Sequence, residues 1–281
     1  MSATEITAGV PTEITAGVPA APRASRDPAV RLTFPRIMRS EWIKLYSLRS
    51  TRWSLLVTLV LTIGLGGLAA LARESHPRGV LDPLSTSLTG VQFAILSVGV
   101  LGVLLISGEY STGMIRSTMS AVPKRLPVLW SKLGVYAAVE LVILLPAVFA
   151  AFFVGQAILS GKHLNIALST PGVPRAVVGA ALFLTLGGLF AMALGAILRN
   201  AAGAISAYVA IMFVIPSLLG LLPSSISNAI APYLPAKAGG AIMDITHKAN
   251  TLSPWAGLAV LSAWTAALIA IAAVQLRRRD V

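Results

Sequence analysis

The hydropathy pattern over residues 53–275 is a series of apolar stretches separated by short polar ones. Six of the stretches approach the ~20 residues that an α-helix needs to cross ~30 Å of hydrocarbon. Membrane-spanning strands typically show about ten residues of alternating hydrophobicity, and these stretches show no such alternation. They therefore predict helices. The predicted spans cover residues 53–72, 89–107, 132–158, 176–198, 201–222 and 255–275.

An amphipathic helix is predicted just before the first span, over residues 34–53. A helix with an apolar stripe and a basic face lies in the membrane interface, with its arginines near anionic headgroups. An ordinary cytoplasmic extension of the first span is the alternative. The apolar stripe consists of Phe34, Met38, Trp42, Leu45 and Trp53, and the basic residues are Arg36, Arg39, Lys44, Arg49 and Arg52.

Residues 1–33 differ from the rest of the chain. An octapeptide that runs from Thr4 to Pro11 is repeated from Thr12 to Pro19, and Pro, Ala, Thr and Gly dominate. Two copies are too few to stack as a solenoid, and no apolar face recurs. We therefore expect a disordered tail in residues 1–33 and a transmembrane domain in residues 34–281.

Composition and charge support a membrane protein and give its orientation. The chain is 56% hydrophobic and 11% charged, against about 25% charged in soluble domains. In such a chain the net charge of +12 reports membrane orientation and not nucleic-acid binding. Sixteen Lys and Arg lie in the tails and loops on one side and six on the other. The positive-inside rule then places both termini and the 108–132 loop in the cytoplasm of a cell-membrane protein.

The polar stretch between the second and third spans is the predicted partner-binding site. It combines a carboxylate, hydroxyls, a glycine hinge, an apolar pair and a cation, a set that lipid contact does not require. A short surface helix with an apolar knob and a charged rim fits a groove on another protein, whereas a solvated loop is the alternative. The site residues are Glu109, Tyr110, Ser111, Thr112, Gly113, Met114, Ile115 and Arg116.

Glu140 is a carboxylate that lies well inside a predicted span, about 12 Å along the third helix. A charge at that depth is costly, so Glu140 should face the bundle interior or a wet cavity. Two readings stay open. The residue lines a translocation or proton path, or it is a structural acid that is neutral or hydrogen-bonded to a neighbouring helix.

No residue set in the sequence indicates catalysis, a bound cofactor or a metal. The chain has no cysteine, and its three histidines stand far apart. The Gly155–His163 run has the wrong glycine spacing for a phosphate-binding loop. Small-residue stripes in the fourth and sixth spans would allow close helix packing, within one bundle or across a dimer. They are Gly187, Ala191 and Gly195, and Ala259, Ala263 and Ala267.

The 223–254 segment, on the side opposite the termini, is Pro-punctuated and moderately polar. It is either a re-entrant segment buried against protein or a plain external loop. Pro146 and Pro216 predict kinks in the third and fifth spans.

The run from Gly108 to Thr118, with its Glu-Tyr-x-x-Gly-x-Ile-Arg core, resembles permease subunits of the ABC type-2 exporter family from actinobacteria. The six spans, the cytoplasmic termini and the Arg39–Leu45 run of the amphipathic helix are similar to that family as well. The resemblance covers about residues 34–281, and its sharpest part is that core.

The resemblance implies an elbow helix at residues 34–53 and a coupling helix at 109–118 that docks on a separate ATPase subunit. Two permease chains and two ATPase chains would form the exporter, and ATP and Mg would bind the ATPase alone. Spans two and three would carry the movement of the coupling helix into the bundle. An ion-gradient-driven transporter with Glu140 as its proton site, and a non-transporting membrane scaffold, are the rival functions.

Overall fold

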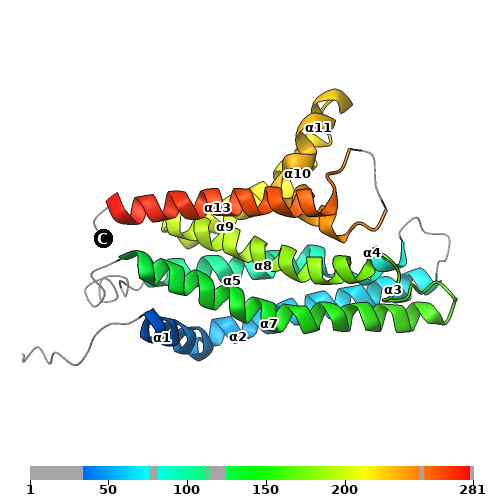
Figure 1. Cartoon of the computed structure of the whole chain (residues 1–281), viewed down its shortest axis with the longest axis horizontal. Coiled ribbons are helices and arrows are strands. Elements are labelled where there is room, and N and C mark those ends of the chain that lie inside the picture. Colours follow the sequence, from blue (N-terminus) through cyan, green and yellow to red (C-terminus); the bar gives the residue numbers. More distant parts are fainter. Residues whose placement is uncertain (1–33, 76–81, 112, 114–124, 247–249, 279–281) are drawn as a thin grey trace, which may run out of the picture. The chain divides into compact units, whose positions relative to one another are not determined.

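The computed structural model describes residues 34–75, 82–111, 113, 125–246 and 250–278. The chain divides into the units Met1–Leu32 and Thr33–Val281, and all described residues belong to the second. These ranges contain helices and turns but no strand (Figure 1). The all-α prediction is thus confirmed for the described part of the chain, whereas the predicted 1–33 tail lies outside it.

Among the described residues, six helical segments are long and apolar enough to cross a membrane, which confirms the predicted number of candidate spans and supports a multi-pass architecture. Each predicted span overlaps one of them. The segments are α2–η1–α3 (Arg49–Val60, Leu61–Leu65, Gly66–Ser75), α5 (Val91–Ser111), α7 (Arg125–Ser160), α8 (Val173–Leu198), α9–η2–α10 (Ala201–Val209, Ala210–Val214, Ile215–Leu219) and α13 (Pro254–Arg278).

Two predicted boundaries need correction. α5 continues through Ser111, and α7 begins at Arg125 and runs for 36 residues, about 54 Å. The predicted 108–132 loop therefore shortens to residues 112–124, of which the structure describes only Gly113. Lys132, expected in that loop, lies in the second turn of α7 and is buried.

α8 forms the centre of the bundle, with most of its residues buried. It packs closely on α5 through glycines, because a side chain on Gly102 would meet the backbone carbonyl of Gly188. A side chain on Gly187 would meet the Ile95 side chain of α5, and one on Gly195 would meet the Ile106 side chain. The small-residue stripe of the fourth span thus packs within the bundle. The stripe of the sixth span, Ala259, Ala263 and Ala267, is exposed on α13.

Two buried tyrosines fasten neighbouring helices to α5. The Tyr136 hydroxyl of α7 donates a hydrogen bond of 2.9 Å to the Val98 carbonyl oxygen. The Tyr208 hydroxyl of α9 donates one of 2.8 Å to the Ile95 carbonyl oxygen. Because a buried hydroxyl needs a partner, these contacts fix the rotation of α7 and α9 against α5.

The first and fifth spans each contain a π-helical segment, η1 and η2. Such segments locally break the regular hydrogen-bond ladder of a helix. η2 ends one residue before Ile215-Pro216, so the irregularity expected from Pro216 is present in the fifth span. α7 stays helical through Pro146.

The segment before the last span folds into short helices and turns back onto the bundle. Its elements are α11 (Ser224–Ile230), η3 (Ala231–Tyr233), α12 (Pro235–Gly240) and η4 (Ala241–Met243). The two remaining short helices, α1 (Phe34–Ser47) and α4 (Pro83–Ser87), precede the first and second spans. Gly239 contacts Phe183 of α8 and Leu261 of α13, and Ile242 is fully buried. α10 and α11 stand away from the bundle axis in Figure 1. Residues 235–243 therefore pack between α8 and α13, as the re-entrant alternative requires.

We expect Gly102→Ala to destabilise the protein by about 1–3 kcal/mol, because the new methyl group would force α5 away from α8. Gly134→Ala on α7 is the matched control, since nothing lies within 4 Å of the added carbon there. Thermal unfolding of the purified chain in detergent measures both. An equal melting temperature for the two variants would contradict the close α5–α8 contact.

Candidate functional site

Four charged side chains from three helices meet at one end of the bundle. Glu41 and Lys44 come from α1, Glu109 from the last turn of α5, and Lys132 from the start of α7. Lys132 Nζ lies 2.5 Å from Glu41 Oε2 and 2.9 Å from Glu109 Oε1. Lys44 Nζ lies 2.8 Å from Glu41 Oε1 and 3.2 Å from Glu109 Oε1. We call these four residues the charged cluster.

The charged cluster is almost sealed from solvent. The two carboxylate side chains are 4–5% exposed and Lys132 is 9% exposed, whereas Lys44 at 31% reaches the edge. Two positive and two negative charges cancel, and each lysine bridges both carboxylates. A buried charge of this kind is tolerated only when it is paired and hydrogen-bonded.

α1 turns an unexpected face toward the bundle. Ile37, Glu41 and Leu45, spaced four residues apart, are buried, so one carboxylate sits in the middle of the inward face. Trp42 and Tyr46 point outward and are 50% and 72% exposed. The predicted apolar stripe is thus divided between the bundle and its surroundings. Leu45 packs inward, whereas Phe34, Trp42 and Trp53 are exposed.

Burial and pairing act in opposite directions on the pKa values in α1. Burial alone raises the pKa of the Glu41 carboxyl, but the charge and hydrogen bonds of Lys132 and Lys44 bring it below its ordinary value of 4.5. Burial alone lowers the pKa of Lys44, but its contacts with Glu41 and Glu109 hold it above its ordinary value of 10.5. Pairing outweighs desolvation for both groups, so both stay ionised near neutral pH.

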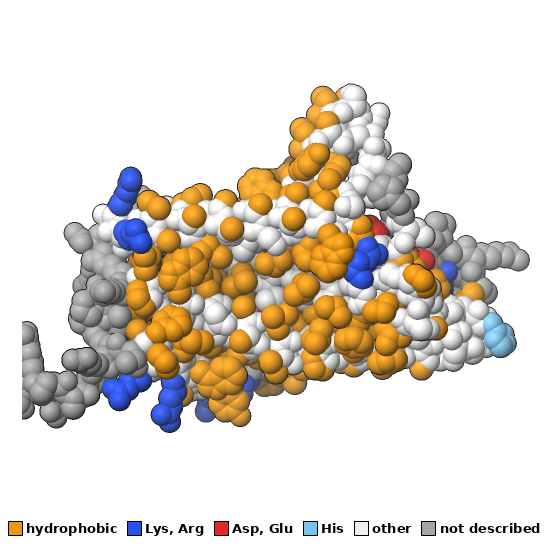
Figure 2. All heavy atoms as spheres, viewed as in Figure 1, with side chains coloured by type: hydrophobic (Ala, Val, Ile, Leu, Met, Phe, Trp, Pro, Cys, Tyr) orange, Lys and Arg blue, Asp and Glu red, His pale blue; other side chains and the backbone are white. Residues whose placement is uncertain are grey.

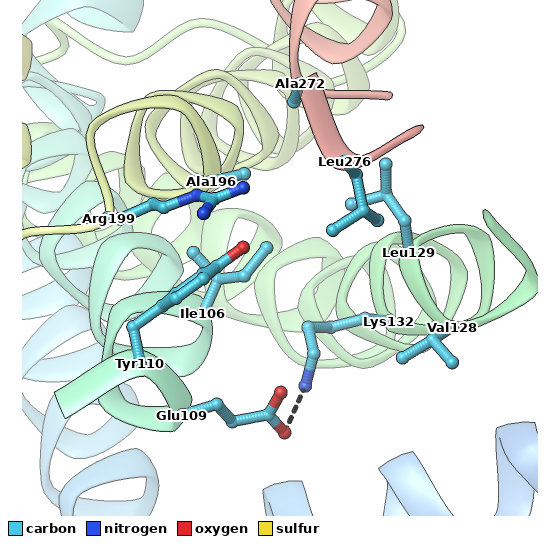
Figure 3. A pocket seen from close by; sticks show the side chains of 10 residues that line it. All are labelled: Ile106, Glu109, Tyr110, Val128, Leu129, Lys132, Ala196, Arg199, Ala272 and Leu276. Atoms are coloured by element: carbon cyan, nitrogen blue, oxygen red, sulfur yellow. Dashed lines mark hydrogen bonds and ion pairs between the residues drawn. The ribbon is translucent and has the colours of Figure 1, made fainter. Parts of the chain in front are cut away.

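Beside the charged cluster lies a second contact between helix ends. The Arg199 guanidinium, in the α8–α9 turn, stands 5.2 Å from the centre of the Tyr110 ring at the end of α5. Figure 3 shows Tyr110 under Arg199, and Lys132 pointing toward Glu109. A small cavity of about 20 Å³ between them, large enough for one water molecule, is also lined by Leu276 of α13. The ends of α5, α7, α8 and α13 therefore converge here.

A larger cavity of about 460 Å³ opens on the other side of the charged cluster. Its walls are mostly apolar, with Leu45, Leu48, Leu104 and Leu105 among the residues that line it. Glu109 lines both cavities, and its Oε2 has no hydrogen-bond partner among the described residues. The arrangement offers charge pairing and apolar volume, but no nucleophile poised beside a base.

The predicted partner-binding residues divide into two groups. Glu109, Tyr110 and Ser111 are the last residues of α5. The prediction of a separate surface helix that starts at Glu109 is therefore corrected. The Glu109 carboxylate is held within the charged cluster and is not a free contact for a partner. Gly113 has a left-handed backbone (φ 69°), which suits a glycine hinge. The remaining residues, Thr112, Met114, Ile115 and Arg116, lie outside the described part of the chain.

Glu140 lies near the middle of α7 and is 1% exposed, so its expected position inside the bundle is confirmed. Neither carboxylate oxygen has a hydrogen-bond partner among the described residues. Tyr136, one turn earlier on α7, directs its hydroxyl to Val98. Glu140 does not belong to the charged cluster, and both of its predicted roles stay predictions.

Sequence reasoning assigned no site role to Glu41 or Lys132. The signal for Glu41 was its place between Ile37 and Leu45, because a carboxylate flanked by apolar residues at i±4 needs a buried partner. Gln156 is a second buried polar residue to which no site role was assigned. Its amide bonds Ser87 at 2.9 Å and the Pro83 carbonyl at 3.1 Å, joining α7 to α4 at the other end of the bundle.

Comparison with protein-family models gives no match, and comparison with curated proteins gives none. Among the described residues, no group of three or more His, Cys, Asp or Glu could hold a metal ion. The site is therefore interpreted from its own geometry.

We expect Lys132→Met to destabilise the protein by about 3–5 kcal/mol, because it leaves two buried carboxylates with one shared lysine. The double variant Lys132→Met/Glu109→Gln should recover much of that loss, since it removes one charge of each sign. Lys162→Met, at an exposed position, is the control. A double variant less stable than Lys132→Met in thermal melts would contradict the pairing.

The pKa shifts predict how the stability of this end depends on pH. Glu41 has a lowered pKa, so its contribution is complete above 4.5 and is lost as the pH falls through the folded value. Lys44 has a raised pKa, so its contribution is complete below 10.5 and is lost as the pH rises through the folded value. Between these limits Glu41 and Lys44 should add no pH dependence to the melting temperature. A Glu41→Gln variant should lose the acid-side slope, and an unchanged slope would exclude Glu41 as its source.

Proposed function

We propose that this chain is the transmembrane permease subunit of an ATP-driven exporter of the ABC type-2 class. It forms the translocation pathway, and a separate ATPase subunit binds ATP and Mg. The proposal rests on the resemblance of the Gly108–Thr118 run and on the arrangement of the helices around it. The excess of Lys and Arg on one side supports a cell-membrane orientation with both termini in the cytoplasm.

The charged cluster is the observation that carries the proposal. Segment 112–124 is bracketed by the end of α5 and the start of α7, and Glu109 and Lys132 join those two helices directly. Glu41 and Lys44 add α1 to the same unit. A push on the segment by a partner would therefore move three helix ends together and reach the bundle as a rigid-body displacement.

Glu109 and Tyr110 take their roles from this arrangement, and Met114, Ile115 and Arg116 take theirs from the resemblance. Glu109 anchors the coupling segment to the bundle, and Tyr110 packs under Arg199. Met114 and Ile115 fill a groove on the ATPase, and Arg116 fixes the register there. A second permease chain completes the pathway, and the exposed stripe of Ala259, Ala263 and Ala267 on α13 is a surface where two helices can approach closely.

Purification of the tagged full chain from its native membranes tests the proposal. We expect an ATPase to co-purify, and we expect Met114→Asp/Ile115→Asp to remove it because two charges cannot enter an apolar groove. Lys162→Asp/His163→Asp, at the opposite end of the bundle, is the matched control and should retain the ATPase. An eluate of the unaltered chain without ATP hydrolysis would contradict the proposal.

An ion-gradient-driven transporter is the second candidate, and the burial of the Glu140 carboxylate inside the bundle favours it. The purified chain alone, in vesicles filled with a pH-sensitive dye, separates the two functions. A proton flux without any ATPase, abolished by Glu140→Gln, would support the gradient-driven function. Vesicles that show no proton flux, and that transport only when the ATPase and ATP are added, would support the exporter.

A further inference from the structure

The corner between α1 and α2 presents the uncapped beginning of a helix. Leu48 occupies the N-cap position with an extended backbone, and no side chain caps the first turn of α2. The first N–H groups of a helix have no partner within it, and together with the helix dipole they attract anions. By itself this feature is common in proteins.

Thr51, in the first turn of α2, adds an independent observation. The residue is 1% exposed, and its hydroxyl has no hydrogen-bond partner among the described residues. A buried hydroxyl without a partner costs free energy. Thr58 and Thr62, further along the same span, bond backbone carbonyls four residues earlier. No such bond is made by the Thr51 hydroxyl within the described residues.

Thr51 lines a groove of about 250 Å³ between the α1–α2 corner and α7. Thr51 and Arg52 supply polar groups at one part of this groove, and the other walls are apolar or aromatic. The aliphatic and indole walls come from Trp42, Leu45, Leu55, Val139, Val142 and Ile143. This size and lining suit a segment of an acyl chain.

Two arginines lie in the first turn of α2, and one of them, Arg52, lines the groove. Arg49 and Arg52 are exposed and lie three residues apart, on the same side of α2. Figure 2 shows Lys and Arg side chains beside apolar ones at the end of the molecule where α1 lies. Guanidinium groups bind phosphate with paired hydrogen bonds, and exposed aromatic rings such as Trp42 and Tyr46 suit the headgroup level of a membrane.

We propose that the α1–α2 corner is a binding site for one anionic phospholipid. Its phosphate accepts hydrogen bonds from Arg52, the Thr51 hydroxyl and the first N–H groups of α2, and Arg49 adds positive charge. One acyl chain lies in the groove against α7. A zwitterionic lipid would bring its own cation next to these arginines and binds more weakly. The site uses no residue of the charged cluster and none of segment 112–124, so we expect its loss to leave binding of an ATPase unchanged.

Quenching of Trp42 fluorescence by brominated lipids tests this site. The full chain, with Trp53, Trp130, Trp255 and Trp264 replaced by Phe, is placed in phosphatidylcholine bilayers. Rising fractions of phosphatidylglycerol or phosphatidylcholine with dibrominated acyl chains are then added. We expect half-maximal quenching at a several-fold lower fraction of the brominated phosphatidylglycerol. Equal quenching by the two lipids would overturn the proposal.

Matched variants separate a built site from general surface charge. Arg49→Gln/Arg52→Gln should weaken the phosphatidylglycerol preference about fivefold for each arginine removed. Arg277→Gln/Arg278→Gln changes the net charge equally, at exposed residues near the end of α13, and should retain the preference. An equal loss of the phosphatidylglycerol preference in the two double variants would show that the attraction is nonspecific, and it would overturn the proposal.

Thr51→Val tests the buried hydroxyl, because valine keeps its shape and removes its donor. We expect about fivefold weaker phosphatidylglycerol quenching, which corresponds to one hydrogen bond. The melting temperature in detergent without lipid should be unchanged or higher, since the variant removes an unpaired polar group. An unchanged lipid preference would overturn the role of Thr51, and a lower melting temperature would show that the hydroxyl stabilises the fold instead.

Discussion

The structure depends on the mutual neutralisation of four charges, three of which are buried. Any one of Glu41, Glu109 and Lys132 alone in this setting would cost several kcal/mol of desolvation, and the attraction between opposite charges offsets that cost only when the geometry is good. The lysine–carboxylate distances of 2.5–3.2 Å meet that condition. Because the charges come from three helices, the ends of α1, α5 and α7 must arrive together. The charged cluster is therefore a constraint on topology as much as a source of stability.

This constraint couples the two helices on either side of the short segment between α5 and α7. The two helices that flank the segment are joined to each other through Glu109 and Lys132, and Tyr110 adds a contact with Arg199 in the α8–α9 turn. Close packing through Gly102 and Gly188, and the hydroxyl of Tyr136 on the Val98 carbonyl, continue the contact into the core. Such a tightly packed core transmits a displacement as rigid-body motion and does not absorb it locally. An input at this end would thus be felt along α5, α7 and α8.

Hydropathy predicted the six spans, because each must cover the same apolar thickness. It misplaced the end of α5 and the start of α7. A hydropathy-based span is ended at the first charged residue, whereas the helix itself continues where that charge finds a partner. Glu109 and Lys132 are both such charges, each other's partners across 23 residues of sequence. Their pairing is a tertiary fact that no local pattern contains. The Glu-Tyr-x-x-Gly run contains Glu109, but it could not show that this carboxylate points inward.

The orientation of α1 follows from charge more than from apolar content. Its inward face carries Ile37 and Leu45, and its outward face carries Trp42, Ile43 and Tyr46, so burial of apolar area alone favours neither face strongly. A rotation by one residue, about 100°, would expose similar apolar surface but would carry Glu41 away from Lys132. The two lysines of the charged cluster suit the inward role, because an ammonium on a flexible stem can bridge carboxylates on different helices. After the corner at Leu48 the basic residues are arginines that face outward, where a planar guanidinium matches phosphate. The same short stretch therefore uses one kind of cation to hold the bundle and another to meet its surroundings.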